Sequence, residues 1–236
     1  MKIDTAINFR KNSNIFRNLL NYYKVKVISL FFLSILSLSF VLFSFYYTFN
    51  IFYIHGVSMQ PTLNANWVQS DDSTRDLAVV RPGGNVERGD IIVTRLVDGG
   101  SYLVIKRLIA VGGDVIFISE NSETGRADFF VNGKKIDQSF VVNDRSYEDT
   151  LAKFNALECV SDGVLVVPYD RMFYLGDNRT SSVDSLTRGC DKKSLIYGKL
   201  VESVPHDDNF ISHIFKRLPG NLTIENLKRF FRVSIF

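Results

Sequence analysis

A long stretch without any charged side chain, residues 27–54, constrains the fold of this chain more than any other feature. A helix needs about 20 predominantly apolar residues to cross the hydrocarbon core of a bilayer, and this stretch is longer. Tyr46, Tyr47 and Tyr53 gather near its end, as aromatic residues do at a membrane interface. Asn50 lies there too, which places the expected end of the apolar span near Tyr47. We therefore predict a transmembrane anchor within residues 27–54.

Two alternatives to an anchor compete for the same stretch. A cleavable signal peptide has an apolar region of about 7–15 residues that ends at a small-residue cleavage site. This stretch is longer, and no Ala-x-Ala sequence follows it. A core helix that is apolar on all of its faces would be buried inside the protein, and it stays open as the second alternative.

The charges on either side of the stretch give its direction. Residues 1–26 carry several Lys and Arg side chains, with Asp4 as the single acidic residue. Asp71, Asp72 and Asp76 follow soon after the stretch. Because the cytoplasmic flanks of membrane spans are enriched in Lys and Arg, residues 1–26 are expected in the cytoplasm. The remainder is expected on the outer, periplasmic side of the inner (plasma) membrane.

Beyond the anchor, the sequence is typical of a mainly β protein with antiparallel strands. Residues 90–97 and 101–111 resemble strands on either side of a short glycine turn, which predicts a hairpin. Asn132-Gly133 is a strong signal for a second hairpin turn. Further short strands are expected over residues 115–118, 129–131, 163–168, 172–175 and 194–204, with a short helix within residues 143–158. Short strands separated by turns predict a β sandwich or barrel.

The end of the chain, residues 205–236, has a different pattern. Ile224, Leu227, Phe230 and Phe231 recur at helical spacing, with basic side chains between them. Such a basic amphipathic helix either rests on a membrane surface or packs on the domain, and the sequence leaves both alternatives open.

The composition of the chain excludes few kinds of active site or partner. The net charge of +3 gives no reason to expect a nucleic-acid partner, and three histidines favour neither a His-dependent triad nor a multi-His metal site. Cys159 and Cys190, the only cysteines, lack the C-x-x-C spacing of zinc and redox sites. They could form a disulfide if the domain is exported, or stay two separate thiols. No metal ion and no organic cofactor is expected.

Two residues have the chemistry of a nucleophile and its base. Ser58 lies between Gly56 and Pro61, on a constrained turn that can present a hydroxyl and a free N–H together. Lys106 stands in an apolar row along a predicted strand, where a charged ammonium is costly. Burial lowers the pKa of a lysine, which makes the amine a usable base, as in Ser–Lys pairs. Taken singly, a turn-forming serine and an exposed edge-strand lysine remain the plainer interpretations.

Four segments follow the anchor in a particular order. They are Ser58-Met59-x-Pro61-Thr62-Leu63, then Arg88-Gly89-Asp90-Ile91-Ile92-Val93, then Lys106-Arg107 followed by Gly112-Gly113-Asp114, and finally Gly176-Asp177-Asn178-Arg179-x-x-Ser182-x-Asp184-Ser185. Each segment alone is modestly specific. In this order, behind an anchor, they resemble the four boxes of type I signal peptidases, and the resemblance runs from about Ile54 to Val204.

The resemblance implies a role for several residues near the site. Ser58 is implied as the nucleophile and Lys106 as the general base. Ser182 is implied as the hydroxyl that orients the lysine, and Asp184 and Arg107 as a structural ion pair.

The resemblance also implies where substrate binds and how the domain is organised. Ile54, Ile105 and Met59 match substrate-binding positions, and the two isoleucines match positions that line shallow pockets for small side chains at P1 and P3. A catalytic domain of mostly antiparallel β structure is implied over residues 55–204, with a smaller β lobe inserted over about residues 117–170.

Two positions depart from the better-known version of the family pattern. Some members have a serine two residues before the nucleophile, whose hydroxyl helps the oxyanion hole, and Gly56 stands there instead. The hole would then depend on the Ser58 N–H, with a backbone donor or a water. After Asp184-Ser185 the family usually has an arginine, where this chain has Leu186. This second departure bears on the local ion-pair network.

The implied function is that of a membrane-bound endopeptidase that removes N-terminal signal peptides from exported preproteins. The short tether between Ile54 and Ser58 would keep the site near the lipid bilayer, where the signal segment is anchored too. A Ser–Lys enzyme with another task, such as pilin processing or repressor self-cleavage, is one alternative, although the anchor argues against a repressor. A non-enzymatic β domain with a decayed site is another, against which the intact key side chains argue.

Overall fold

The computed structural model describes residues 2–97 and 101–208, and the chain divides into two compact units after Thr48. The amphipathic helix expected around residues 224–231 lies outside the described residues.

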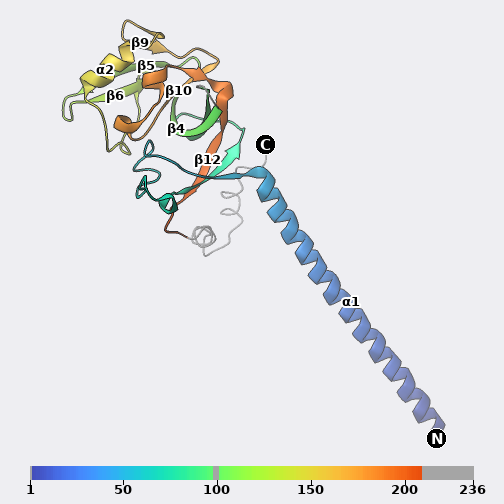
Figure 1. Cartoon of the computed structure of the whole chain (residues 1–236). Helices are drawn as coiled ribbons and strands as arrows, with labels where there is room; N and C mark the ends of the chain where they lie inside the picture. The colour runs from blue at the N-terminus through green and yellow to red at the C-terminus, as the bar shows by residue number, and fades with distance from the viewer. Residues whose placement is uncertain (1, 98–100, 209–236) are drawn as a thin grey trace. The chain divides into compact units, whose positions relative to one another are not determined.

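The first unit is one long helix, α1, over Lys2–Thr48 (Figure 1). Its segment Leu20–Thr48 is long and apolar enough to cross a membrane, and none of its most apolar part is buried. The alternative of a buried core helix is therefore wrong. The helix also ends earlier than the uncharged stretch, because residues Asn50–Tyr53 form the first strand, β1. The last residues of the predicted anchor 27–54 thus belong to the second unit.

The second unit is built around a seven-stranded antiparallel sheet with the order β1-β2-β12-β3-β4-β10-β11. Its other strands are β2 (Leu77–Pro82), β3 (Ile91–Val97), β4 (Ser101–Val111), β10 (Arg171–Leu175), β11 (Asp191–Lys192) and β12 (Ile196–Val204). The predicted hairpin is confirmed, since β3 pairs with β4 along its whole length. On its other side β4 pairs with β10, so β4 is an interior strand.

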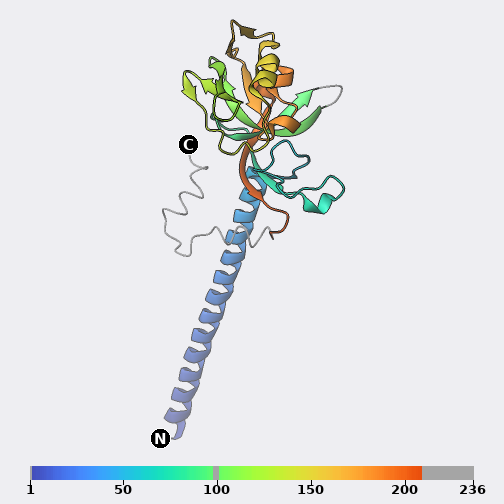
Figure 2. The same cartoon turned by 90° about the vertical axis from the view of Figure 1, so that its left-hand side faces the viewer.

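A second, five-stranded antiparallel sheet follows β4 and precedes β10 in the sequence, with the order β7-β6-β5-β9-β8. Its strands are β5 (Val115–Asn121), β6 (Arg126–Val131), β7 (Lys134–Lys135), β8 (Val160–Ser161) and β9 (Val164–Val166). The helix α2, Tyr147–Asn155, packs on β5 and β6, and Figure 2 shows it in yellow beside these green strands. The prediction of a mainly β, antiparallel fold with a smaller second β lobe is confirmed.

The two sheets share one hydrophobic core. Ile109 of β4, Phe173 of β10, Phe129 of β6 and Phe154 of α2 are buried together in the largest apolar cluster. Leu186, on the short helix α3 (Ser185–Arg188), joins the same cluster. Burying these side chains removes apolar surface of both sheets from water, so the second sheet is stabilised by packing on the first.

Candidate active site

Lys106 lies in the middle of β4 with only 4% of its surface exposed. Lys106 is paired with Ile92 of β3, and Leu108, two residues further along β4, is paired with Tyr174 of β10. Alternation along the strand places Lys106 on the same face as Leu108, which is also buried. The plainer interpretation of an exposed edge-strand lysine is therefore wrong.

The structure brings Lys106 and Ser58 together from distant parts of the sequence. Lys106 Nζ lies 2.8 Å from Ser58 Oγ, and it also donates a hydrogen bond to the carbonyl oxygen of Ile105 at 2.9 Å. In the described part of the chain, no carboxylate forms a hydrogen bond or an ion pair with this ammonium. The ammonium group of Lys106 is thus buried, and both of its hydrogen bonds are to uncharged oxygen atoms.

Burial sets the protonation of Lys106. It lowers the pKa of the lysine from its ordinary value of 10.5 to about 8, while the negative charges of Asp184 and Asp177 oppose part of that change. A substantial fraction of the amine is therefore neutral at mildly alkaline pH. A neutral amine at hydrogen-bond distance from a hydroxyl can accept the proton of that hydroxyl.

Ser58 is presented by a tight turn between β1 and β2. Gln60 N donates to Val57 O at 3.0 Å, which closes the turn around the serine. Gly56 has a φ of 85°, a conformation that glycine adopts without strain and other residues rarely adopt. Among the described residues, the Ser58 N–H donates no hydrogen bond. This N–H is a free donor next to the hydroxyl, as an oxyanion hole requires.

The segment that follows β10 packs directly against this turn. Asn178 N donates to Ser58 O at 3.0 Å. At Gly176, a Cβ would lie 2.5 Å from Ser58 O and 2.3 Å from Ser182 Oγ, which is closer than such atoms can approach. Only glycine fits this position, and the close approach fixes Ser58 relative to the fourth of the sequence segments.

Arg107 forms its ion pair with Asp177, a carboxylate that is 1% exposed. Arg107 Nε donates to Oδ1 at 2.8 Å and Arg107 Nη2 donates to Oδ2 at 2.6 Å, a bidentate arrangement. Thr62 Oγ1 donates to the same Oδ2 at 2.6 Å. The expected pair between Arg107 and Asp184 is therefore wrong, because Asp177 binds Nε and Nη2 of the guanidinium and the remaining nitrogen, Nη1, donates to Gly89 O at 2.8 Å.

Asp184 binds backbone N–H groups instead of a guanidinium. It accepts from Gly176 N at 3.0 Å and from Leu186 N at 3.2 Å, so it caps the start of α3. Leu186 is buried where the family usually has an arginine. Ser182 Oγ is buried and, among the described residues, has no hydrogen-bond partner. The bond by which Ser182 was expected to orient Lys106 is not formed in this structure.

The three residues expected to bind substrate lie in one apolar cluster. Ile54 and Met59 are 4% and 1% exposed, and Ile105 is half-buried against them. Of the three side chains, Ile105 offers the most surface to a ligand. Ile54 and Met59 belong to the buried cluster against which Ile105 packs.

A buried polar pair that the sequence analysis missed supports the Ser58 turn. Asn64 Nδ2 donates to Ile54 O at 2.8 Å and to Gly56 O at 3.2 Å. Asp76 N donates to Asn64 Oδ1 at 2.8 Å, and Asn64 N donates to Asp76 Oδ2 at 2.6 Å. We call this reciprocal pair the Asn64–Asp76 bracket. No periodic pattern marks two residues at this separation, and the only hint is that asparagine tolerates the positive φ of 55° found at Asn64.

The second and third sequence segments meet at a structural corner. Arg88 Nε donates to Asp114 Oδ2 at 2.7 Å. Asp114 also accepts from Val111 N at 2.8 Å and from Asn132 Nδ2 at 3.0 Å. These bonds stabilise the turn through which the chain passes from β4 to β5. Arg88 and Asp114 therefore have a structural role where the two sheets join.

Comparisons with known proteins agree with this arrangement. The family described as signal peptidase, peptidase S26, matches residues 25–204. Signal peptidase I P of Bacillus subtilis subsp. natto is 32% identical over 142 residues, which cover 59% of this chain and 67% of that protein. Signal peptidase I U of Bacillus subtilis (strain 168) is 32% identical over 165 residues, covering 69% of this chain and 79% of that protein.

A solved structure is similar as well. The crystal structure of a signal peptidase I from Enterococcus faecalis V583 matches 50% of this chain and 98% of that one, with 24% identity and a TM-score of 0.37. The family match covers the apolar end of α1 together with both sheets and all four sequence segments. The chain therefore belongs to the signal peptidase family, peptidase S26, and is a membrane-anchored serine endopeptidase.

Proposed function

We propose that this enzyme removes N-terminal signal peptides from exported preproteins, with Ser58 as the nucleophile and Lys106 as the general base. The observation that carries the proposal is the distance of 2.8 Å between Lys106 Nζ and Ser58 Oγ in a buried setting. The signal peptidase I proteins among its relatives give the substrate class.

The chemistry proceeds through an acyl-enzyme. Neutral Lys106 accepts the proton of Ser58 as Oγ attacks the carbonyl carbon of the scissile bond. The Ser58 N–H stabilises the negative oxygen of the tetrahedral intermediate. Collapse of that intermediate breaks the C–N bond, and Lys106 returns the proton to the leaving amine. Lys106 then takes a proton from a water that attacks the ester. The bond between Ser58 Oγ and the acyl carbon breaks, Lys106 returns that proton to Oγ, and the signal peptide leaves with a new carboxylate.

The surrounding residues have positioning roles in this proposal. Asp184 holds Gly176 and caps α3, while Asp177 fixes Arg107 next to Lys106 on β4. Ser182 remains the candidate to orient the lysine, because its buried hydroxyl has no other partner among the described residues. When Lys106 becomes protonated during the reaction, such a hydroxyl can accept from the new N–H.

Substrate selection would rest on the cluster of Ile54, Ile105 and Met59. Ile54 and Met59 are already buried, so we expect the recesses above them to be shallow and to suit alanine-sized side chains at P1 and P3. Inserting a larger side chain would force the packed cluster apart, at a cost of about 1–3 kcal/mol. We expect efficient cleavage after Ala and poor cleavage after Leu or Phe.

The proposed topology follows from the charges around α1. Residues 1–26 lie in the cytoplasm, the apolar part of α1 crosses the inner (plasma) membrane, and residues 55–204 act on the periplasmic side. The partners are then preproteins and the lipid bilayer, and no nucleic acid is involved. Residues 205–236 remain a candidate membrane-surface segment.

The test is cleavage of a preprotein by the purified full-length protein in detergent. Ser58→Ala should abolish cleavage, whereas Ser122→Ala, which changes an exposed serine in the β5–β6 turn, should leave it unchanged. Mass spectrometry of the products should locate the cut after a small P1 residue. Persistence of the same cut in Ser58→Ala would contradict the assignment of the nucleophile.

A further inference from the structure

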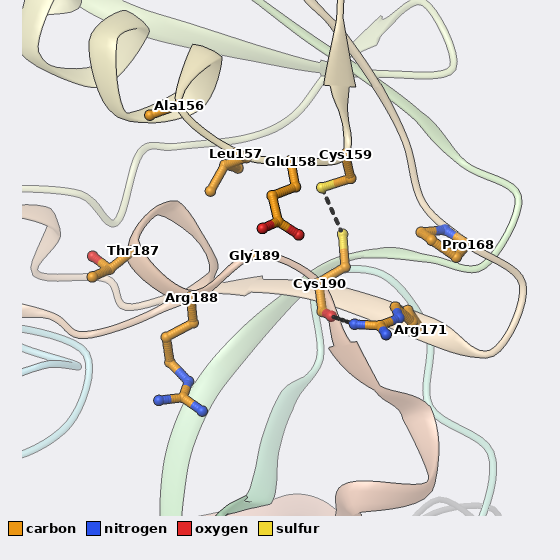
Figure 3. A pocket seen from close by; sticks show the side chains of 10 residues that line it. All are labelled: Ala156, Leu157, Glu158, Cys159, Pro168, Arg171, Thr187, Arg188, Gly189 and Cys190. Atoms are coloured by element: carbon orange, nitrogen blue, oxygen red, sulfur yellow. Dashed lines mark hydrogen bonds between the residues drawn. The ribbon is translucent and has the colours of Figure 1, made fainter. Parts of the chain in front are cut away.

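The two cysteines of the chain are far apart in the sequence, but their side chains face each other in the structure. Cys159 Sγ and Cys190 Sγ are 3.8 Å apart, and Figure 3 shows the two sulfurs pointing toward one another. Cys159 follows α2 and directly precedes β8, in the second lobe. Cys190 follows α3 and directly precedes β11, in the main sheet. The pair therefore bridges the two lobes of the second unit.

We propose that Cys159 and Cys190 form an intramolecular disulfide in the mature enzyme, which ties the second lobe to the segment carrying Ser182 and Asp184. A disulfide has an S–S distance of about 2.05 Å, so each sulfur has to move by roughly 0.9 Å, within reach of a small χ1 adjustment. The proposal rests on the proposed function in one respect, because it requires this part of the chain to lie on the oxidising side of the membrane.

The surroundings keep the two sulfurs in place. Cys190 is buried in the core cluster shared by both sheets, and Cys159 packs against that cluster. Arg171 Nη1 donates to Cys190 O at 2.6 Å, and Gly189 N donates to Ser185 O at 2.9 Å, which fixes the backbone before Cys190. No third thiol exists in the chain to compete for either sulfur.

An oxidant can reach the pair. The two cysteines line an open pocket of about 540 Å³, with Glu158, Thr187 and Arg188 on its other walls. Cys159 is the more accessible thiol, whereas Cys190 is buried. Burial raises the pKa of the Cys190 thiol to about 12, and the neighbouring Cys159 adds to the rise. Cys159 is therefore the thiol expected to react first.

The reaction is thiol–disulfide exchange with an external disulfide, either a small one such as oxidised glutathione or that of an oxidising protein. The Cys159 thiolate attacks the donor disulfide, whose S–S bond breaks and releases one donor thiol. The Cys190 thiolate then attacks Cys159 Sγ in the mixed disulfide and releases the second donor thiol. The two cysteines lose two electrons and two protons in total, and the donor disulfide is reduced by the same two electrons.

The disulfide would close a loop that contains β9, β10 and the whole of the Gly176–Ser185 segment. Restricting such a loop in the unfolded chain stabilises the fold. We expect reduction to lower the Tm of the wild type by on the order of 5–10 °C. Peptidase activity well below that temperature should change little, because neither sulfur touches Ser58 or Lys106.

The first measurement counts free thiols in the full-length protein. Membrane-inserted protein is trapped at lysis with N-ethylmaleimide under denaturing conditions, without reductant, and its intact mass is measured. We expect no adduct before reduction and two adducts after reduction, with a monomer on a non-reducing gel. Two adducts before reduction, or a disulfide-linked dimer, would overturn the proposal. Purified protein reduced and then given oxidised glutathione should lose both thiols in the same assay.

The second measurement compares thermal unfolding with and without reductant in the wild type and in Cys159→Ala/Cys190→Ala. Only the wild type should respond to reductant, and an equal Tm in both conditions would overturn the stabilising role. Preprotein cleavage measured on the same samples separates this inference from the proposed function. Cleavage by protein with two free thiols overturns the disulfide alone. A disulfide in protein that fails to cleave preproteins contradicts the proposed function while the disulfide stands.

Discussion

Lys106 and Arg107 are neighbours on β4, but their charged groups have opposite surroundings: Arg107 is paired with a carboxylate and, within the part of the chain that the structure describes, Lys106 is not. Arg107 meets a buried carboxylate in a bidentate pair and also lies over the ring of Phe140, with 3.9 Å between its guanidinium carbon and the ring centroid. Lys106 contacts only uncharged oxygens among the described residues. A buried cation that is paired with a carboxylate stays charged and keeps its side chain in place. Burial without such a partner lowers the pKa of a lysine toward the range in which the amine can act as a base. One strand thus carries a paired cation, Arg107, and beside it the lysine that we propose as the general base.

The largest expected effect is on catalysis, through Lys106→Met. The methionine fills a similar volume but cannot accept a proton, so turnover should fall by roughly 10²–10⁴-fold in the preprotein assay. Lys135→Met, which removes an exposed lysine from β7, serves as the matched control and should keep wild-type turnover. Turnover in Lys106→Met within a factor of about three of wild type would assign the base to another group.

Arg107→Met should instead damage the fold. It leaves the Asp177 carboxylate buried with Thr62 as its remaining side-chain partner, and breaking a buried pair in this way costs about 3–5 kcal/mol. Urea unfolding at pH 7 measures this loss as a lower midpoint. Asp177→Asn in the same background removes the uncompensated charge and should recover part of the loss. An unchanged urea midpoint in Arg107→Met would contradict the claim that Arg107, unlike Lys106, stabilises the fold through its ion pair.

In the same unfolding experiment Lys106→Met should have the opposite sign. The pKa of Lys106 is lower in the fold than in the unfolded chain, so the fold is destabilised by this lysine below pH 8. Removing it should raise the free energy of unfolding by about 2 kcal/mol at pH 7, after the lost hydrogen bonds are allowed for. The gain should fade as the pH rises from 8 toward 10.5. A gain that is independent of pH would point to packing rather than charge.

A smaller effect is expected from the Asn64–Asp76 bracket. Asn64→Ala leaves the Ile54 and Gly56 carbonyl oxygens without their donor, which should cost about 1–3 kcal/mol of stability. Displacement of the Ser58 turn should lower kcat roughly tenfold, with KM little changed. Asn64→Gly tolerates the positive φ but also lacks the amide, so it should show the same kcat defect. Wild-type kcat in Asn64→Gly would reduce the role of Asn64 to its backbone conformation.

The smallest effect concerns Gly56. A Cβ at this position meets nothing within 4 Å, so Gly56→Ala should cost only the backbone strain of its positive φ, about 1 kcal/mol. Gly56→Ser carries the same strain and adds a hydroxyl two residues before Ser58. A higher kcat in Gly56→Ser than in Gly56→Ala would show that a second oxyanion donor fits. Equal kcat values in both variants and the wild type would place Gly56 outside the oxyanion hole.

The sequence predicted what depends on local pattern and on motif order. The approach of Lys106 to Ser58 could be predicted because both residues lie in segments that follow one another in a recognisable order. The β3–β4 hairpin could be predicted because a glycine turn separates two strand-like runs. β1 was missed because its four residues continue the uncharged stretch of the anchor, where apolar composition hides the change from helix to strand.

What the sequence could not predict depends on which polar groups meet in space. The segment Gly176–Ser185 contains two carboxylates, Asp177 and Asp184, and only the fold decides which of them reaches Nε and Nη2 of Arg107. Asn64 and Asp76 lie in irregular segments between β1 and β2, so their reciprocal bonds become visible only in the structure. The 3.8 Å approach of Cys159 and Cys190 is of the same kind.

The most direct test of the account is the pH dependence of kcat/KM for the wild type, measured with a preprotein from pH 5 to pH 10. Lys106 must be neutral to accept the Ser58 proton, so activity should rise with pH and level off above an apparent pKa of about 8. Asp184 raises the pKa of Lys106, and Asp184→Asn should therefore move the rise to lower pH. A rise centred near pH 4–5 would identify a carboxylate as the base and contradict the claim that the uncompensated lysine of β4 performs the chemistry.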